Sequence, residues 1–322
     1  MVRGLVLGKF LPLHKGHEAL INFASENSDH LTVLLCSNKN EPIPGHKREK
    51  WLNQLYPENN IDIHHLEYDE AELPNTSVSS KKVSKLWADK IKEILPHVNR
   101  LFTSEPYGDF VADFLGIEHR AFELNKTSFP ISATDIRDNP FKNWDLISAV
   151  AKHYFVLKVA IVGTESTGKT ILTEKLAKHF NTSFAKEMAR EIVPKTEECT
   201  FDNLNQIAEK QAKEIEKAVI TANKIMFSDT DLNISKSYAQ FLFNKELIVR
   251  DRVKEVNKFD LILYLENDAK YIQDGTRLKI NRRDKLDQSH RLHFREQKVV
   301  FINGNWEERF QKSLAEIAKI YS

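Results

Sequence analysis

The fold is decided by the stretch Gly163-Thr164-Glu165-Ser166-Thr167-Gly168-Lys169-Thr170, near the middle of the chain. It fits G-x-x-x-x-G-K-[ST], the pattern of a phosphate-binding P-loop. The apolar segment 156–162 before it is typical of a buried strand, and the amphipathic segment 171–178 after it is typical of a helix. Because strand, loop and helix form the context that the pattern requires, a chance match is a poor alternative. The stretch predicts a nucleoside triphosphate site.

Each residue type in this loop has a physical role. Glycine lets the backbone turn so that its N–H groups point at phosphate oxygens. Lys169 is expected to reach the β- and γ-phosphates, and the hydroxyl of Thr170 to ligate Mg²⁺. ATP is therefore the expected co-substrate and Mg²⁺ the expected cofactor. The predicted nucleotide contacts from the loop are Gly163, Thr164, Glu165, Ser166, Thr167, Gly168 and Thr170.

A second apolar segment, 224–231, ends in Asp229 and Asp231. An aspartate at the end of a strand beside a P-loop can bind Mg²⁺ or orient the nucleophile. The two carboxylates cannot share one face if the strand continues, so one of them is expected to serve as base or metal partner. We expect Asp229 in that role and Asp231 near the substrate. A capped strand end is the alternative.

Length and composition limit the class of protein. The chain has 322 residues, which gives room for two domains of ordinary size. It has 47 basic and 46 acidic residues, a balance that argues against a whole-chain footprint for nucleic acid. Two distant cysteines favour a reducing compartment, and we find no signal peptide or long apolar run. We expect a soluble cytoplasmic protein with no membrane and no nucleic-acid partner; a homo-oligomer stays open.

The first half alternates strand-like and helical segments. Strand-like segments at about 31–36, 61–66, 100–103 and 118–122 are separated by helical ones. Such alternation predicts a parallel sheet with helices on both faces, and ligands that bind at the carboxyl ends of its strands. The predicted fold is α/β with two doubly wound parallel-sheet domains. We expect a Rossmann-like domain at 1–154 and a P-loop kinase domain at 155–322.

His14, Gly16 and His17 follow the first strand and form H-x-G-H at a helix start. This pattern resembles the signature of the superfamily that transfers AMP or CMP to a nucleophile. Two imidazoles that donate hydrogen bonds, with a helix N-terminus behind them, can stabilise charge that develops at an α-phosphate. Zinc ligation, general acid–base chemistry and incidental loop histidines are the alternatives.

A second stretch, Ile131-Ser132-Ala133-Thr134-Asp135-Ile136-Arg137, resembles the I-S-x-T-x-x-R element of the same superfamily. There Ser132, Thr134 and Arg137 would hold the ATP phosphates at a helix start. Ordinary helix capping explains the stretch alone, and the earlier H-x-G-H favours the functional interpretation.

Three large side chains in the first half are candidates for contact with the acceptor nucleotide. Arg48 and Trp51 share one helix face, and Trp87 lies in a later helix. A planar ring of the acceptor would favour an aromatic face, and core packing is an equal alternative for both tryptophans.

The order of the motifs carries a wider resemblance. The strings GKFLPLHKGH, PIPGHKREKW, FTSEPYG, ISATDIRDNPFKNW, VAIVGTESTGKT, FSDTD and DGTR follow one another as in NadR-type bifunctional enzymes. That family pairs nicotinamide mononucleotide (NMN) adenylyltransferase with ribosylnicotinamide kinase, and its small-molecule partners are nicotinamide riboside, NMN, ATP and NAD. The resemblance implies both activities here.

The resemblance also implies roles for single residues. His14, His17 and Arg137 would serve adenylyl transfer, and Lys169 and Asp229 would serve phosphoryl transfer. The remaining implied contacts are Gly8, Lys9, Phe10 and Arg277 with nucleotide, and Tyr271 and Asp274 with substrate. Tyr271 stands where the family usually has tryptophan, and Gln273 replaces an acid of a D-D-G-x-R pattern, which bears on kinase specificity.

Some family members carry an N-terminal helix-turn-helix domain. Only seven residues precede Gly8 here, so we expect that domain to be absent and no operator binding. Two rival hypotheses remain. One is another adenylyltransferase–kinase fusion, such as a coenzyme A synthase, and the other is a nucleotide sensor with decayed catalytic sites.

Overall fold

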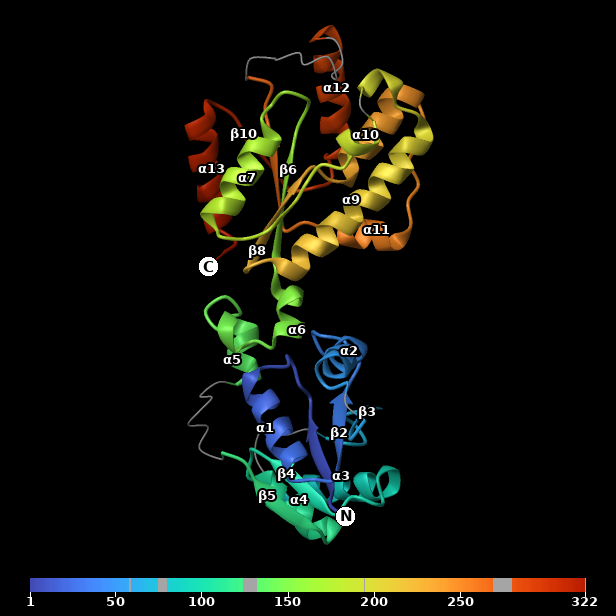
Figure 1. Cartoon of the computed structure of the whole chain (residues 1–322), viewed down its shortest axis with the longest axis vertical. Coiled ribbons are helices and arrows are strands. Elements are labelled where there is room, and N and C mark those ends of the chain that lie inside the picture. The colour runs from blue at the N-terminus through green and yellow to red at the C-terminus, as the bar shows by residue number, and fades with distance from the viewer. Residues whose placement is uncertain (58, 75–79, 124–131, 194, 269–279, 322) are drawn as a thin grey trace. The chain divides into compact units, whose positions relative to one another are not determined.

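A computed structural model describes residues 1–57, 59–74, 80–123, 132–193, 195–268 and 280–321. The chain divides into two compact units, Met1–Lys152 and His153–Ser322 (Figure 1). Each unit contains one five-stranded sheet, and every strand pair in both sheets is parallel. The predicted fold class, two α/β domains with parallel sheets, is confirmed.

The first unit alternates strands and helices along the chain. Its elements are β1 (Arg3–Gly8), α1 (Lys15–Glu26), β2 (His30–Ser37), α2 (Gly45–Leu55), β3 (Ile61–Glu67), α3 (Lys81–Ile94), β4 (Arg100–Thr103), α4 (Tyr107–Leu115), β5 (Glu118–Ala121), α5 (Ala133–Asp138), the 3-10 helix η1 (Trp144–Leu146) and α6 (Ala149–Lys152). The strand order is β3-β2-β1-β4-β5. Because the order reverses beside β1, the crevice past the carboxyl ends of β1 and β4 is the expected ligand site.

Both faces of the first sheet are covered by helices. Leu101 on β4 belongs to a buried cluster with Ala88 of α3 and Val111 of α4. The next residue on the strand, Phe102, meets Phe23 of α1 edge to face, with ring centroids 5.9 Å apart. Successive strand residues point to opposite faces, so α3 and α4 cover one face and α1 covers the other.

The second unit carries the P-loop after its first strand. Its elements are the 3-10 helix η2 (His153–Phe155), β6 (Leu157–Val162), α7 (Lys169–His179), β7 (Phe184–Ala185), α8 (Ala189–Ile192), the 3-10 helix η3 (Thr196–Glu198), α9 (Phe201–Thr221), β8 (Ile225–Asp229), α10 (Leu232–Phe243), α11 (Asp251–Val256), β9 (Leu261–Leu265), α12 (Ile280–His293), β10 (Val299–Ile302) and α13 (Trp306–Ala318). The strand order β10-β9-β6-β8-β7 places β6 at the centre.

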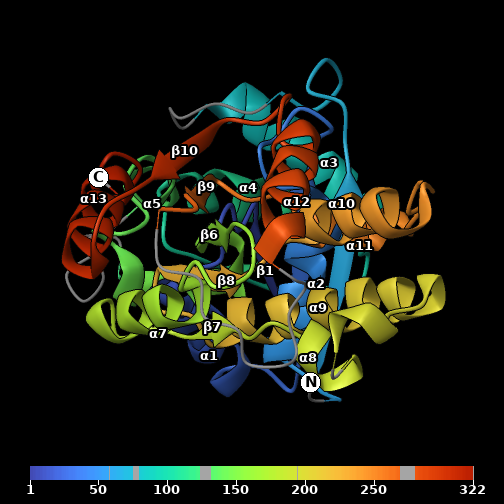
Figure 2. The same cartoon turned by 90° about the horizontal axis from the view of Figure 1, so that it is seen from above.

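Alternate residues of β6 face two separate apolar clusters. Ile161 packs with Leu176 of α7 and Phe310 of α13, whereas Val162 packs with Ile234 of α10. Figure 2 shows the same division, with α7 and α13 on one side of the sheet and α9, α10 and α12 on the other. Because β6 is buried on both faces, the loop after it has a rigid support.

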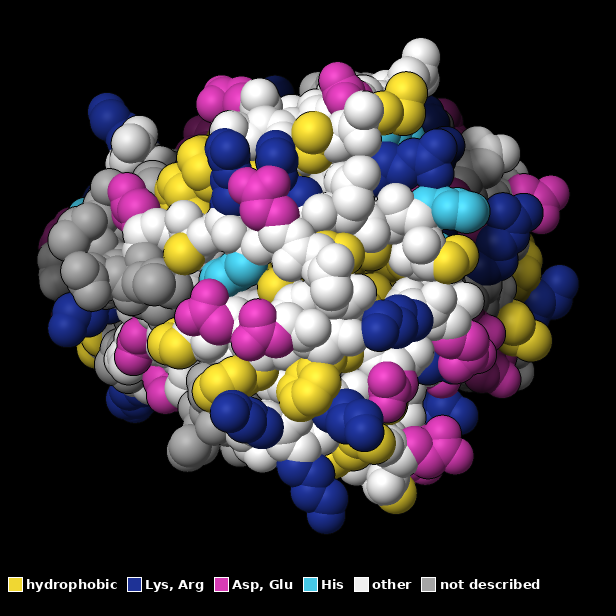
Figure 3. All heavy atoms as spheres, turned by 90° about the horizontal axis from the view of Figure 1, so that it is seen from below, with side chains coloured by type: hydrophobic (Ala, Val, Ile, Leu, Met, Phe, Trp, Pro, Cys, Tyr) yellow, Lys and Arg dark blue, Asp and Glu magenta, His cyan; other side chains and the backbone are white. Residues whose placement is uncertain are grey.

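The surface carries both charge signs side by side. On the face that Figure 3 shows, Lys and Arg side chains lie next to Asp and Glu side chains, in keeping with a net charge of +1. Within the described ranges, none of the helices combines the length and apolar character needed to cross a membrane.

Candidate active sites

The P-loop of the second unit wraps between β6 and α7. Two glycines in the left-handed region make the turns, Gly163 with φ 140° and Gly168 with φ 84°. A Cβ on Gly163 would lie 2.7 Å from the carbonyl oxygen of Leu265, which is too close for any side chain. The sequence therefore needs glycine there for conformation and for space.

Hydrogen bonds to one backbone carbonyl group hold the P-loop in its conformation. The carbonyl oxygen of Thr164 accepts hydrogen bonds from the hydroxyl of Thr167 at 2.8 Å and from the Lys169 ammonium at 3.1 Å. The Lys169 ammonium thus lies at the loop, and backbone N–H groups at the start of α7 are available to an anion. This arrangement suits a polyphosphate, since amides and the helix N-terminus both favour negative charge.

Thr170 and Asp229 meet beside the loop. The Thr170 hydroxyl donates to Asp229 Oδ2 at 2.5 Å, while Oδ1 of this 1% exposed aspartate has no hydrogen-bond partner. Burial, and next the negative charge of Glu187, raise the pKa of Asp229 to about 6. A buried carboxylate oxygen without a donor, next to a hydroxyl, fits a hard cation such as Mg²⁺.

Asp231 lies past the end of β8 and caps α10. Its carboxylate accepts hydrogen bonds from the backbone N–H of Ile234 at 3.2 Å and from the Asn233 amide at 2.7 Å. Burial raises the pKa of this 1% exposed carboxyl group to about 6. A capping role was the alternative that the sequence analysis kept for these aspartates, and the contacts of Asp231 fit it. A contact of Asp231 with substrate stays a prediction.

In the first unit, the H-x-G-H loop follows β1. His14 is the N-cap of α1, and its Nδ1 accepts a hydrogen bond from the backbone N–H of Gly16 at 3.1 Å. In the neutral ring the proton is therefore on Nε2, which makes that atom a donor. The rings of His14 and His17 stack with centroids 3.7 Å apart, and Phe10 meets His17 edge to face at 5.0 Å. The loop thus presents two adjacent imidazoles.

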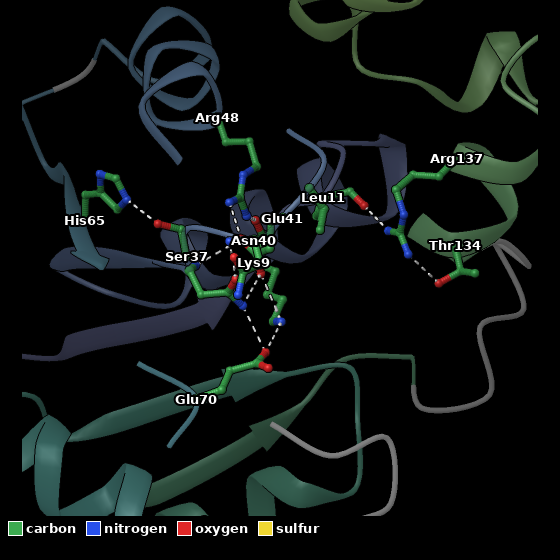
Figure 4. Close-up of polar contacts among 11 residues, drawn as sticks. Lys9, Leu11, Ser37, Asn40, Glu41, Arg48, His65, Glu70, Thr134 and Arg137 are labelled. Carbon is green, nitrogen blue, oxygen red and sulfur yellow. Dashed lines mark hydrogen bonds and ion pairs between the residues drawn. The ribbon is translucent and has the colours of Figure 1, made fainter. Parts of the chain in front are cut away.

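The structure brings the second motif to the first. The Arg137 guanidinium donates to the carbonyl oxygen of Leu11, inside the H-x-G-H loop, and to the Thr134 hydroxyl at 2.9 Å (Figure 4). Ser132 caps α5 in a reciprocal capping box with Asp135. Residues 126 positions apart in the sequence are therefore joined at the carboxyl edge of the sheet, where a phosphate chain could be held.

Lys9 and Arg48 belong to a buried ion cluster after β1. Lys9 Nζ lies 2.9 Å from Glu41, and the fully buried guanidinium of Arg48 pairs with Glu41 and donates to the Lys9 carbonyl oxygen at 2.5 Å (Figure 4). These contacts fix the backbone that enters the H-x-G-H loop. They give Arg48 a supporting role, and its direct contact with substrate stays a prediction.

The chain is similar to known proteins along most of its length. Residues 158–309 match the AAA domain family. The chain is 32% identical over 297 residues to the trifunctional NAD biosynthesis/regulator protein NadR of Escherichia coli (strain K12), covering 85% of this chain and 71% of that protein. The NadR protein of Salmonella typhimurium (strain LT2) is also 32% identical, with the same coverage. This chain belongs to the NadR family.

Solved structures of the NadR family share the fold of the whole chain. A crystal structure of NadR protein in complex with NAD and AMP-PNP has a TM-score of 0.78 at 22% identity, and it covers 99% of this chain and 95% of that one. A crystal structure of NadR protein in complex with NR has a TM-score of 0.80, also at 22% identity, with coverage of 98% and 95%. The order of the two α/β units is therefore that of NadR structures.

The two tryptophans that were candidates for substrate contact are engaged within the protein. Trp51 on α2 is 2% exposed. Trp87 on α3 is half-buried, donates its Nε1–H to the Pro74 carbonyl oxygen at 3.1 Å and meets Tyr68 edge to face. Core packing accounts for both, and contact with nicotinamide stays a prediction. The predicted contacts Tyr271, Asp274 and Arg277 lie outside the described residues.

Sequence reasoning missed Arg309, which braces the P-loop from α13. This 1% exposed residue donates to the carbonyl oxygens of Thr167 at 2.6 Å, Gly304 at 2.8 Å and Glu266 at 3.0 Å, and it pairs with Asp268. A charged residue at a buried position of an amphipathic helix was the only signal available. One planar guanidinium thus links the loop to the segments after β9 and β10.

We expect Arg309→Met to loosen the kinase site of this NadR-family chain. Methionine keeps the apolar stem but leaves buried carbonyl groups without donors, which costs about 3 kcal/mol of stability. Urea unfolding should show that loss, together with weaker ATP binding. Lys319→Met, at the exposed C-cap of the same helix, removes a surface ion pair with Glu316. It is the matched control and should change stability by less than about 0.5 kcal/mol. Equal stability of the two variants would contradict the bracing role.

Proposed function

We propose that this protein is a bifunctional enzyme of NAD synthesis. The second unit phosphorylates the 5′-hydroxyl of nicotinamide riboside with ATP and gives NMN. The first unit transfers an adenylyl group from another ATP to NMN and gives NAD and pyrophosphate. One observation carries the proposal: a single chain of the NadR family holds a P-loop with a Thr170–Asp229 pair and an H-x-G-H loop joined to Arg137.

In the kinase reaction the protein positions and neutralises charge. The P-loop amides and Lys169 bind the β- and γ-phosphate oxygens and stabilise the negative charge that shifts to them as the γ-phosphoryl group leaves ADP. Support for this role comes from the contact of Lys169 with the loop at the start of α7. The rigid strands β6 and β8 keep the loop and Asp229 in register, with Ile161 opposite Asp229.

Thr170 and Asp229 are the residues that would hold Mg²⁺. Their hydroxyl and carboxylate oxygens match the oxygen ligands that this ion prefers, and the unpartnered Oδ1 of Asp229 would gain a partner. When bound, Mg²⁺ supplies charge neutralisation at the β- and γ-phosphates. Neutralisation of charge beside Asp229 would also offset the burial that raises its pKa.

In adenylyl transfer the nucleophile is a phosphate oxygen of NMN. It forms a bond to the α-phosphorus of ATP, the bond between that phosphorus and the β-bridging oxygen breaks, and pyrophosphate leaves with the electron pair. His14 donates from Nε2 to an α-phosphate oxygen, with His17 stacked beside it. Arg137 and the hydroxyl of Thr134 hold the leaving phosphates from the start of α5.

We assign residues 1–154 to adenylyl transfer and residues 155–322 to the kinase. The small-molecule partners are then nicotinamide riboside, NMN, ATP and NAD, all of which are bound at carboxyl ends of parallel strands. Cytoplasmic location and the absence of a nucleic-acid partner remain predictions of the sequence.

The proposal is tested by offering MgATP with different acceptors. We expect phosphorylation of nicotinamide riboside and adenylylation of NMN, each followed by chromatography of the products. Dephospho-coenzyme A and phosphopantetheine, the substrates of the rival coenzyme A fusion, should give no product. Turnover of those two compounds, without turnover of nicotinamide riboside, would overturn the proposal in favour of the rival.

A further inference from the structure

A second carboxylate lies beside Asp229 at the edge of the kinase sheet. Glu187 follows β7, which pairs in parallel with β8, and Ala185 is opposite Ser228. Asp229 is the next residue on β8, so both acids follow adjacent strands at their carboxyl ends. Ligands of parallel sheets bind at this edge, and the P-loop leaves the neighbouring strand β6 at the same edge.

The backbone next to Glu187 is fixed to the sheet. Gln211 of α9, which is 3% exposed, accepts from the backbone N–H of Met188 at 2.9 Å and donates to the Ser228 hydroxyl at 3.4 Å. The buried glutamine therefore ties the segment after β7 to β8. The backbone next to Glu187 is therefore held in a defined position relative to β8, which ends at Asp229.

The side chain of Glu187 differs from that of Asp229 in accessibility. Glu187 is 20% exposed, and its carboxylate lies 3.7 Å from Nε of Arg190, whose side chain is 64% exposed. A separation of 3.7 Å is long for an ion pair, so the carboxylate can accept a hydrogen bond from another donor. Asp229, by contrast, is buried and already accepts the Thr170 hydroxyl.

The negative charge of Glu187 acts on two buried groups close to the P-loop. It adds to burial in raising the pKa of Asp229. The pKa of the Tyr238 hydroxyl is raised by burial, then by the charge of Glu165 and then by that of Glu187. Tyr238 of α10 donates to Glu165 of the P-loop at 3.1 Å. Glu187 therefore lies within electrostatic range of the end of β8 and of the P-loop side of α10.

The two carboxylates suit different tasks. A carboxylate beside a P-loop threonine that binds Mg²⁺ is a weak base, because the cation withdraws its electrons. The unpartnered and buried Oδ1 of Asp229 points to a cation as its missing partner. Glu187 is partly exposed and does not belong to the Thr170–Asp229 pair, so its carboxylate is the one accessible to the acceptor hydroxyl.

We infer that Glu187 is the catalytic base that accepts the proton of the 5′-hydroxyl in the kinase reaction, an inference that rests on the proposed function. The O–H bond of the riboside breaks and its proton goes to the Glu187 carboxylate. The 5′-oxygen forms a bond to the γ-phosphorus, and the bond from that phosphorus to the β-bridging oxygen breaks. ADP leaves with that electron pair, and the carboxylic acid later returns its proton to water.

Glu187→Gln tests the assignment in the full-length protein. The amide keeps the size of the side chain but cannot take a proton, so kcat for nicotinamide riboside should fall about 100-fold. The KM for ATP should stay within about twofold, because Lys169 and Thr170 are untouched. Adenylylation of added NMN should not change, because it belongs to the other unit, and the unchanged KM for ATP shows that the kinase unit of the variant is folded. Glu187→Asp, which retains the carboxylate, should recover part of the lost rate.

Glu191→Gln is the matched control, because Glu191 is an exposed acid of the adjacent helix α8. It should keep the kcat of the unsubstituted protein.

If the unsubstituted protein makes NMN and Glu187→Gln has the same kcat as that protein, the inference is wrong while the proposed function stands. A loss of kcat matched by an equal loss of ATP affinity would also overturn it, as would a Glu187→Asp variant no better than the glutamine one. Absence of NMN from the unsubstituted protein would overturn the proposed function itself.

Discussion

Lys169→Ala is expected to lower kcat of the kinase about a thousandfold and to leave adenylylation of NMN unchanged. The ammonium group lies at the P-loop, where it donates to the Thr164 carbonyl oxygen. Under the proposed function it stabilises the charge that moves onto the β- and γ-phosphate oxygens in the transition state. Loss of one preorganised donor of this kind lowers the rate on the order of 10²–10³-fold. The measurement is the initial rate of NMN formation from nicotinamide riboside and MgATP.

The control for this variant is Lys178→Ala, at an exposed position of the same helix α7. It removes one positive charge from the same element but lies three turns from the loop, so both activities should persist. A Lys169→Ala variant with more than a tenth of the original kinase rate would contradict the assignment of the P-loop as the phosphoryl-transfer site.

His17→Ala is expected to show the reverse pattern. Its imidazole stacks on His14 at the start of α1, and both rings lie where the α-phosphate of ATP is expected. Loss of one donor to a developing negative charge lowers kcat about 10²–10³-fold, so NAD formation from NMN should fall by that factor. Phosphorylation of nicotinamide riboside should continue at the original rate and NMN should accumulate.

His97→Ala is the matched control for the histidine, because His97 is an exposed residue just before β4, at the opposite edge of the sheet. Both activities should survive that substitution. If His17→Ala and His97→Ala form NAD equally fast, the H-x-G-H loop is not the adenylyl-transfer site.

The sequence predicted those parts of the sites that are local. The strand, loop and helix around Lys169 lie within about twenty residues, and each has its own signal in apolar pattern or glycine spacing. The alternation of strands and helices likewise predicted both parallel sheets. Local propensity and the hydrophobic period are enough for such features, because neighbouring residues decide them.

Contacts across long stretches of sequence were not predictable in the same way. Arg309 donates to the Thr167 carbonyl oxygen, 142 positions away, and its place on the buried face of α13 does not indicate which loop it contacts. Arg48 shows the same limit, since its pairing with Glu41 and the Lys9 carbonyl oxygen appears only when α2 meets the loop that follows β1. Whether a large side chain supports a loop or meets a ligand depends on such packing.

The most direct test of the central claim is one incubation of the purified protein with nicotinamide riboside, ATP and Mg²⁺, followed by chromatography. The account predicts that NMN appears first and that NAD and pyrophosphate follow, because the first unit uses the NMN that the second unit makes. Formation of neither NMN nor NAD, under conditions in which the protein is folded and binds ATP, would contradict it.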